Sequence, residues 1–472
     1  MLEEAMDWIV SAGRRYATAT MAVGLLAVLA TSIAVTHLVA PHVGTFSDLL
    51  GRLANLRDLQ STGNIYVPFD KEAFTYPPGA VLLFWPILWI GQSLVPLVWT
   101  IFSLAALVGT IFAGLKYLLH QSVTWSLAVA CWMAVLSVAL FPPVLEDLSW
   151  GQTGTFLLLL VALDSLLIRG NTKGILVGLA TAFKIYPGVF IIIFLLRRQW
   201  RAAINATVTA IATTGLAWIL WPKSVSYFFS KELLGGGELA HFRGGTQAAA
   251  SSSLVDFLFR APFRIPPTTF ESVTVFLLVV IVGLMAARTL WRQGFELSST
   301  LVALIASVVG APIAWDHYFV FASLLLLVPI EMGWHHALSR TAVAAAAVMV
   351  VPWYRFRRPA PGSWWVSTYV FVSRNAILFA ALSILLVATF ETLKAARFRV
   401  HATSLVTRPK LVFTTPVVAH FIRAIGHGGR EKLRSTTSFV QQPELEAEPA
   451  KASARVARRR AKNEDGVLSE PA

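Results

Sequence analysis

Residues 16–40, YATATMAVGLLAVLATSIAVTHLVA, decide the fold class of this chain. No charged residue stands between Arg15 and His37, and an apolar run of about 20 residues is long enough to cross the hydrocarbon core of a bilayer as a helix. The run lacks a small-residue cleavage pattern, so we interpret it as a retained membrane helix and not as a signal peptide. The basic pair Arg14 and Arg15 in front of it predicts that the N-terminus lies inside the cell.

The composition extends this interpretation to the whole chain. Of its 472 residues, 56% are hydrophobic and 14% are charged, and the mean hydropathy is +0.65. Soluble domains have about 45–50% apolar and about 25% charged residues, so the composition excludes a water-soluble globular protein. The single cysteine, Cys131, excludes a disulfide framework and a cysteine zinc cluster, and its apolar neighbours predict a small buried side chain.

Nine further stretches resemble the first in apolar character, although two of them are short. Two more apolar segments, 77–92 and 174–196, contain Pro86 and Pro187 near their middles, where proline removes a helix hydrogen bond. They either cross fully or return to the side they entered, which lipid permits only where protein covers the broken backbone. The chain is therefore predicted to be all-α, a polytopic bundle of 10–12 transmembrane helices. The ten predicted spans are 16–40, 95–118, 124–141, 155–168, 202–221, 273–288, 297–313, 318–332, 341–351 and 364–390.

The distribution of Lys and Arg orients these spans, because short cytoplasmic loops carry an excess of both. We favour partial crossings for 77–92 and 174–196, which keep the basic loops inside, whereas two full crossings move Lys116, Arg169 and Lys173 outside. Both arrangements place the two termini inside. The loops predicted to lie outside are 41–76, 223–271 and 352–363.

Much of the net charge of +14 lies at the end of the chain. From residue 393 onward there are 15 Lys and Arg against 7 Asp and Glu, which contributes +8. These residues lack a sustained apolar period, so they predict a basic, mostly disordered cytoplasmic tail near anionic lipid. We divide the chain into an N-terminus (1–15), a transmembrane domain (16–392) and the tail (393–472).

Polar side chains at the ends and breaks of the spans are the candidate functional residues, because such groups are costly next to lipid. The first outer loop contains Asp48 within GTFSDLL (44–50) and runs to Tyr76 within FTYPPG (74–79). Asp48 is the first acid after the first crossing, which makes it a candidate base. An alternative of equal weight is that Asp48 caps a helix over residues 49–60.

Two further groups lie where apolar segments begin or break. Gln152, within LSWGQTG (148–154), can donate a hydrogen bond to a phosphate or a sugar hydroxyl, although a simple cap or loop role is the plainer interpretation. Lys184 and Tyr186 lie in AFKIYP (182–187), where the apolar segment breaks. A lysine at this position needs an anion unless its side chain reaches the interface, and we favour an anionic partner such as a lipid phosphate.

The segment APIAWDHY (311–318) joins two spans on the outer side. Asp316 beside His317 can orient an imidazole for proton transfer, and Trp315 is the type of surface on which sugar rings stack. The same group of residues is also compatible with an ordinary loop between helices. We weigh the two interpretations equally.

Two other outer segments add candidate ligands. The basic run WYRFRR (353–358) breaks the positive-inside pattern, so Arg355, Arg357 and Arg358 are predicted to hold a phosphate. Gln247 lies in a polar loop that can hydrogen-bond a sugar or an acceptor. The sequence has no Walker loop, H-E-x-x-H motif or metal-spaced Cys/His set, so ATP-driven and zinc-protease functions are excluded and no cofactor or metal is predicted.

Six short motifs, taken in order, resemble glycosyltransferase family 87. The resemblance covers roughly residues 20–390 and implies a GT-C membrane enzyme of the bacterial envelope, with a polyprenyl-phosphate sugar as donor and a glycolipid or glycan as acceptor. Arg52 is a departure, because many members have an aromatic residue at this place in a D-L-x-x-Y motif. The six motifs are SDL (47–49), YPP (76–78), GQ (151–152), Gly178 through KIYP (184–187), LLRR (195–198) and WDH (315–317).

The resemblance also implies roles for particular residues. Asp48 matches the essential acid of the first outer loop and His317 matches a histidine of a later one, so either is a candidate for the base. Lys184 and Tyr186 match the K-x-Y-P stretch, which is expected near the donor phosphate. The candidates for sugar or acceptor binding are Tyr76, Gln152, Gln247, Trp315 and Asp316.

The sequence therefore predicts a cell-membrane glycosyltransferase that transfers a hexose, with mannose expected first, on the extracytoplasmic side. Attack on C1 opposite the departing phosphate predicts inversion, with Lys184 or the arginines at 355–358 stabilising the phosphate. The alternatives are an arabinofuranosyltransferase of the same family and a transporter or flippase for a lipid-linked sugar, which needs no base. A structural membrane subunit would leave the polar clusters unexplained.

Overall fold

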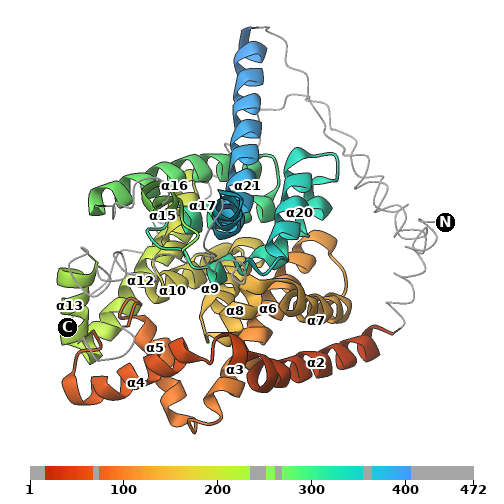
Figure 1. The fold of residues 1–472 in the computed structure, drawn as a ribbon. Helices are drawn as coiled ribbons and strands as arrows, with labels where there is room; N and C mark the ends of the chain where they lie inside the picture. Colours follow the sequence, from red (N-terminus) through yellow and green to blue (C-terminus); the bar gives the residue numbers. More distant parts are fainter. Residues whose placement is uncertain (1–15, 67–73, 234–250, 261–267, 354–363, 405–472) are drawn as a thin grey trace, which may run out of the picture. The chain divides into compact units, whose positions relative to one another are not determined.

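The computed structural model describes residues 16–66, 74–233, 251–260, 268–353 and 364–404, which belong to one compact unit. All regular secondary structure in these ranges is helical, which confirms the all-α class (Figure 1). The elements are α2 (Ala17–Ala34), η1 (Val35–Val39), α3 (Ala40–Val43), α4 (Ser47–Thr62), α5 (Ala80–Phe84), η2 (Trp85–Trp89), α6 (Val95–Leu119), α7 (Val123–Leu140), α8 (Pro142–Ser149), α9 (Gly154–Ala162), η3 (Leu163–Leu167), η4 (Gly170–Thr172), α10 (Ile175–Phe183), η5 (Tyr186–Gly188), α11 (Val189–Leu196), α12 (Trp200–Leu220), α13 (Pro222–Tyr227), η6 (Phe228–Glu232), α15 (Leu254–Arg260), α16 (Thr269–Arg292), α17 (Glu296–Val309), η8 (Asp316–Phe319), α18 (Ala322–Leu325), α19 (Val328–Met332), α20 (Ala337–Met349) and α21 (Trp364–Ser404).

Helices that can span a membrane confirm the polytopic membrane class. Within the described ranges six helices are long and apolar enough to cross, and α8 together with residues 154–167 (α9 and η3) forms a pair bent by 115°, which is either a broken span or a re-entrant loop. Four shorter apolar helices accompany them, so the total of ten to twelve crossings stays a prediction. The six are Ala17–Val43, Val95–Leu119, Val123–Leu140, Trp200–Leu220, Phe270–Arg292 and Asn375–Ala395.

These helices pack side by side through their apolar side chains, which form the main hydrophobic core. Figure 1 shows α2 beside α7, and α16 beside α17 and α21. Cys131 on α7 is fully buried in the main hydrophobic core, as its apolar neighbours predicted. The predicted boundary at 392 falls inside α21, while the N-terminus and the tail beyond 404 lie outside the described residues.

The predicted span over 318–332 is wrong as a continuous helix. The chain there forms three short pieces, η8, α18 and α19. Pro329 lies in the first turn of α19 and cannot donate the hydrogen bond that would continue α18 into it. Phe319 and Leu325 are completely buried, whereas Leu326 and Ile330 are 41% and 44% exposed, so this apolar stretch is only partly enclosed by protein.

Residues 174–196 form two short helices with a break between them. α10 ends just before Lys184, and α11 begins after the proline that breaks the segment. Asn205, near the start of the following helix, donates to the carbonyl oxygens of Asn171 at 2.7 Å and Lys173 at 2.9 Å. The start of the segment therefore lies against α12, and the partial crossing stays a prediction. In 77–92, α5 changes at Pro86 into the 3₁₀ helix η2.

A second hydrophobic core holds the first outer loop in place. It contains buried residues of α4, among them Leu49 and Leu56, together with Tyr76, Phe84 and Trp99. Burying each leucine contributes about 1.5–3 kcal/mol, so α4 is anchored on its apolar face. The polar face of α4 is thereby held against the breaks in the membrane helices.

Candidate active site

The first outer loop docks on the break between α8 and α9. Thr45 and Phe46 adopt left-handed backbone conformations, with φ of 53° and 51°, which turn the chain into α4. The amide of Phe46 donates to the carbonyl of Ser149 at 2.9 Å, and the amide of Leu49 donates to the carbonyl of Trp150 at 3.3 Å. These bonds fix the start of α4 over residues 149–152.

Gly151 permits this close approach. It has a φ of +70°, and a Cβ on it would lie 2.4 Å from the Cβ of Leu49. A glycine is the residue that adopts this backbone conformation without cost and leaves room for α4. The next residue, Gln152, is therefore presented directly to Asp48.

Asp48 is the second residue of α4, and its side chain is 26% exposed. The N-cap position belongs to Phe46, so the alternative in which Asp48 caps the helix is wrong. The Oδ2 atom of Asp48 accepts hydrogen bonds from Arg52 Nη2 at 3.2 Å and from Gln152 Nε2. Oδ1 accepts a long bond from Ser47 Oγ at 3.4 Å, so this oxygen is the more available to a substrate.

Arg52 lies one turn after Asp48 and was not among the predicted site residues. It is 6% exposed, and it donates to the Gly151 carbonyl at 2.9 Å and to Gln152 Oε1 at 3.0 Å. Its spacing of four residues from Asp48 was the signal in the sequence, because such pairs share one face of a helix.

Tyr76 joins this group as predicted, from the other end of the outer loop. Its hydroxyl donates to Gln152 Oε1 at 2.9 Å and accepts from Thr153 Oγ1 at 3.3 Å. Its ring centroid lies 4.7 Å from the Arg52 guanidinium carbon and 5.2 Å from Lys184 Nζ. The tyrosine ring therefore lies in contact with both cations.

Lys184 lies at the break in the 174–196 segment and is surrounded by tyrosine rings. Its Nζ is 3.7 Å from the ring centroid of Tyr318, 5.2 Å from that of Tyr76 and 5.8 Å from that of Tyr186. Within the described parts of the chain it forms no ion pair with a carboxylate. Contacts with aromatic faces hold a cation without neutralising it, so Lys184 can still bind an anion.

His317 and Asp316 lie beside this cage. Asp316 accepts a hydrogen bond from Ser252 Oγ at 2.7 Å, and His317 Nε2 has no hydrogen-bond partner among the residues described. No hydrogen bond between Asp316 and His317 is found among the described residues, so the orienting role of Asp316 stays a prediction. Burial lowers the pKa of His317 well below its usual value, so the imidazole is neutral. Its ring lies 4.9 Å from that of Tyr318.

Asp147 is a buried acid that supports the site. The sequence interpretation did not identify it. Its two carboxylate oxygens accept from the amides of Gly154 at 2.9 Å and Thr155 at 3.2 Å. These bonds satisfy the first amides of α9 and stabilise the sharp bend after α8. The bend in turn places Gln152.

The other predicted ligands are not brought into this group by the described structure. The carbonyl of Trp315 accepts from the amide of Tyr318 at 2.9 Å, while its indole has neither a hydrogen bond nor a ring contact among the described residues. No cluster of three His, Cys, Asp or Glu that could hold a metal is found in the part of the chain described. Gln247, Arg355, Arg357 and Arg358 lie outside the described residues.

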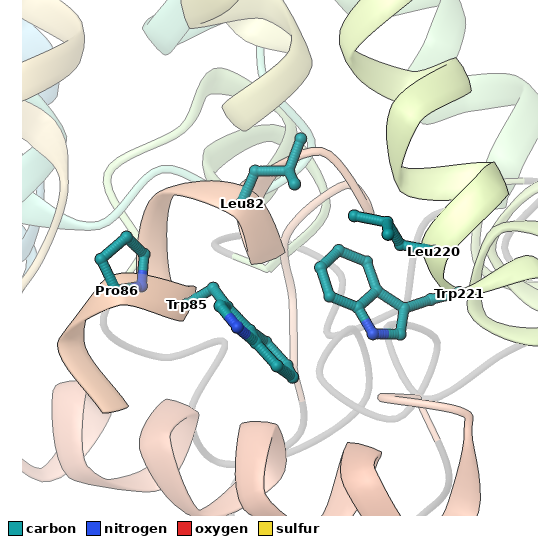
Figure 2. A pocket seen from close by; sticks show the side chains of 5 residues that line it. All are labelled: Leu82, Trp85, Pro86, Leu220 and Trp221. Carbon is teal, nitrogen blue, oxygen red and sulfur yellow. The ribbon is translucent and has the colours of Figure 1, made fainter. Parts of the chain in front are cut away.

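An apolar pocket is lined by residues of the 77–92 segment and of the end of α12. It has a volume of about 290 Å³, and Figure 2 shows Trp85 and Trp221 among its lining residues. The ring centroids of these tryptophans are 5.1 Å apart. Phe84, which directly precedes Trp85 in the chain, contacts the ring of Tyr76 at 5.6 Å. The lining consists of Leu82, Trp85, Pro86, Leu220 and Trp221.

We compared the sequence of this chain with models of known protein families. The family model described as "Glycosyltransferase family 87" matches residues 74–315, just over half of the chain. The chain belongs to glycosyltransferase family 87. The expectation of a family 87 membrane glycosyltransferase is thus confirmed. Tyr76, Gln152 and Lys184 lie within the matched range, whereas Asp48 and His317 lie outside it.

Three relatives are similar over longer stretches. A polyprenol-phosphate-mannose-dependent alpha-(1-2)-phosphatidylinositol mannoside mannosyltransferase of Mycobacterium tuberculosis is 26% identical over 339 residues, which cover 66% of this chain and 77% of the relative. A phosphatidylinositol pentamannoside mannosyltransferase of Mycolicibacterium smegmatis with the same donor dependence is 26% identical, covering 68% and 76%. A second M. smegmatis relative, with the same name as the M. tuberculosis protein, is 27% identical, covering 59% and 67%.

Proposed function

We propose that this family 87 glycosyltransferase moves mannose from a polyprenyl-phosphate donor to a hydroxyl of an envelope glycolipid, with inversion. The observation that carries the proposal is that Gln152 bonds both Asp48 and the hydroxyl of Tyr76, whose ring also contacts Lys184. An accessible carboxylate and a cation without a carboxylate partner are the two groups that this transfer requires. The names of the relatives support mannose as the sugar and a phosphatidylinositol mannoside as the acceptor class.

Asp48 is the proposed base. Arg52 and Gln152 both donate to its Oδ2 atom, while Oδ1 has one long bond from Ser47. Oδ1 removes the proton of the acceptor hydroxyl as the hydroxyl oxygen attacks C1 of the sugar, and the bond from C1 to the phosphate oxygen breaks on the opposite face. Proton transfer by a positioned carboxylate contributes about 10²–10⁴-fold to rate.

Lys184 is the proposed ligand of the departing phosphate. A phosphate needs cationic stabilisation as its charge grows, and a cation held in a water-poor site is already organised for this task. His317 is 8% exposed, so we assign it a helper role, in which it packs against Tyr318 in the wall of the lysine cage. Asp48, which is more exposed, remains the better placed base.

The donor lipid also needs an apolar surface next to the phosphate. The apolar pocket lined in part by Trp85 and Trp221 offers such a surface, and Phe84, next to Trp85 in the chain, contacts the ring of Tyr76 (Figure 2). We propose that the first isoprene units of the donor lie there.

We further propose that the site faces the extracytoplasmic side of the cell membrane and that both termini are cytoplasmic. The segment 174–196, taken as a partial crossing, supports this orientation, because its break carries Lys184 while Lys173 and Arg197 lie at its two ends. Basic residues favour the cytoplasmic side, so the break and the outer loop with Asp48 are directed away from it.

A transfer assay on purified protein in lipid tests the proposal. Labelled polyprenyl-phosphate mannose and a phosphatidylinositol mannoside are offered to wild type, Asp48→Asn and His317→Ala, with Asp58→Asn on the same helix as the matched control. We expect product from wild type and Asp58→Asn, a loss of at least about 10²-fold in Asp48→Asn, and a smaller loss in His317→Ala.

Other outcomes would contradict the proposal in distinct ways. Product from a pentose donor but not from the mannose donor would change the sugar and keep the mechanism. Full transfer by Asp48→Asn would remove Asp48 as the base. Movement of donor lipid across the bilayer without transfer, unaffected by Asp48→Asn, would favour a transporter.

A further inference from the structure

Arg52 is a second cation in the site, and its surroundings differ from those of Lys184. The side chain is 7% exposed, against 26% for Asp48. One face of the guanidinium is 4.7 Å from the ring centroid of Tyr76, and the ring centroid of Phe84 is 5.7 Å away. Arg52 is therefore enclosed by aromatic rings within the outer-loop core.

The hydrogen bonds of Arg52 are directed at the protein itself. Nη1 donates to the carbonyl of Gly151 at 2.9 Å, and Nη2 donates to Asp48 Oδ2 at 3.2 Å and to Gln152 Oε1 at 3.0 Å. Both terminal nitrogens are thus engaged, and the side chain is buried. A bidentate contact with a phosphate would require breaking these bonds.

These bonds also determine how Gln152 is oriented. Its Oε1 atom accepts from Arg52 and from the hydroxyl of Tyr76, so its Nε2 atom is left to donate to Asp48 Oδ2. Arg52, Gln152 and Asp48 thereby form a closed ring of hydrogen bonds in which Oδ2 receives two donors. The consequence is that Asp48 presents Oδ1 to the substrate.

We propose that Arg52 is a positioning residue that acts through Asp48, by holding its carboxylate in place with its Oδ1 atom directed to the acceptor, and that it does not bind the donor phosphate. This inference rests on the proposed function, in which Asp48 is the base. The two cations then have different roles. Arg52 positions the base, Asp48, and Lys184 binds the departing phosphate. The site thus uses arginine where a planar fork is needed to reach three acceptors, which a lysine ammonium cannot do in the same geometry.

A double-mutant cycle separates this role from phosphate binding. The transfer rate and the donor KM are measured for wild type, Arg52→Gln, Asp48→Asn and the double variant, with Arg57→Gln on the exposed face of α4 as the matched control. If Arg52 acts through Asp48, Arg52→Gln lowers kcat by about 10²-fold in the wild-type background and by less than about twofold in the Asp48→Asn background. The donor KM stays within about twofold, and Arg57→Gln behaves like wild type.

Arg52→Lys keeps the charge but loses the fork, and it covers the case in which Arg52→Gln does not fold. We expect Arg52→Lys to recover only part of kcat, leaving a loss of about tenfold with the donor KM unchanged. The amount of labelled donor bound per protein at saturation shows that each variant is folded, because a misfolded fraction lowers it and a positioning defect does not.

The results that overturn the inference are specific. A donor KM raised tenfold or more by Arg52→Gln or Arg52→Lys would make Arg52 a phosphate ligand, and equal losses in both backgrounds would make it independent of Asp48. Unchanged kcat in Arg52→Gln would remove it from the mechanism. Absence of transfer by wild type itself would instead refute the proposed function.

Discussion

Replacing Lys184 by methionine tests the proposed division between base and phosphate ligand most directly. Methionine has a similar length and no charge, so Lys184→Met removes the cation from the tyrosine cage with little change in volume. The ammonium is 3.7 Å from the ring centroid of Tyr318, and the rings of Tyr76 and Tyr186 lie at 5.2 Å and 5.8 Å. The substitution therefore removes a charge that no described carboxylate neutralises.

The expected size of the effect follows from this geometry. A cation about 4 Å from a phosphate charge contributes about 4 kcal/mol at an effective dielectric constant of about 20. Removal of a donor that stabilises a developing anion costs roughly 10²–10³-fold in kcat, so we expect a loss in that range. The free energy of unfolding should change by only about 1 kcal/mol, because the lost cation–π contacts are offset by relief from burying a charge.

The assay compares transfer and thermal unfolding for wild type, Lys184→Met and Lys184→Arg, with Lys223→Met as a control at an exposed lysine. Lys184→Arg keeps the charge and should retain more activity than Lys184→Met. Transfer by Lys184→Met at the wild-type rate, with donor binding unchanged, would refute the assignment of Lys184 to the phosphate. A large loss of stability together with activity would show that Lys184 is structural.

Two further predictions concern the walls of the site. Gly151→Ala should lower stability by about 1–3 kcal/mol and reduce transfer, because its Cβ would lie 2.4 Å from Leu49 Cβ. Gly170→Ala has a similar φ of +74° but open space around it, so equal unfolding temperatures for the two variants would contradict the clash. Trp221→Ala should raise the KM for a long-chain polyprenyl donor severalfold but not for a short-chain one, and Trp89→Ala, at a side chain that is 80% exposed, should change neither. An equal effect of Trp221→Ala on both donors would place the isoprene units elsewhere.

Two of the long apolar spans were predicted to within one residue, whereas the helix Thr269–Arg292 extends four residues beyond each end of the predicted 273–288. The helices Val95–Leu119 and Val123–Leu140 lie where 95–118 and 124–141 were predicted, because a crossing needs an uninterrupted run of about 20 apolar residues. The stretch 318–332 was misjudged for the same reason. Hydropathy alone does not distinguish one continuous helix from three short pieces such as η8, α18 and α19.

The candidate site, too, was only partly predictable from the sequence. Asp48, Tyr76, Gln152 and Lys184 were found because polar groups beside membrane segments are rare, and the structure brings these four together. The part played by Arg52 escaped the sequence interpretation, because its acceptors on Gly151 and Gln152 are about 100 residues away along the chain.

The sequence by itself determined that this protein is a helical membrane protein and where its apolar segments break, since both follow from local chemistry. A run without charge favours a membrane helix, and Pro187 interrupts one wherever it is packed. Only the tertiary structure decided which oxygen of Asp48 has fewer hydrogen bonds, that Asp316 accepts from Ser252, and that Lys184 lies among tyrosines. These pairings depend on the docking of α4 onto a bent helix 104 residues further along, and no local pattern encodes that contact.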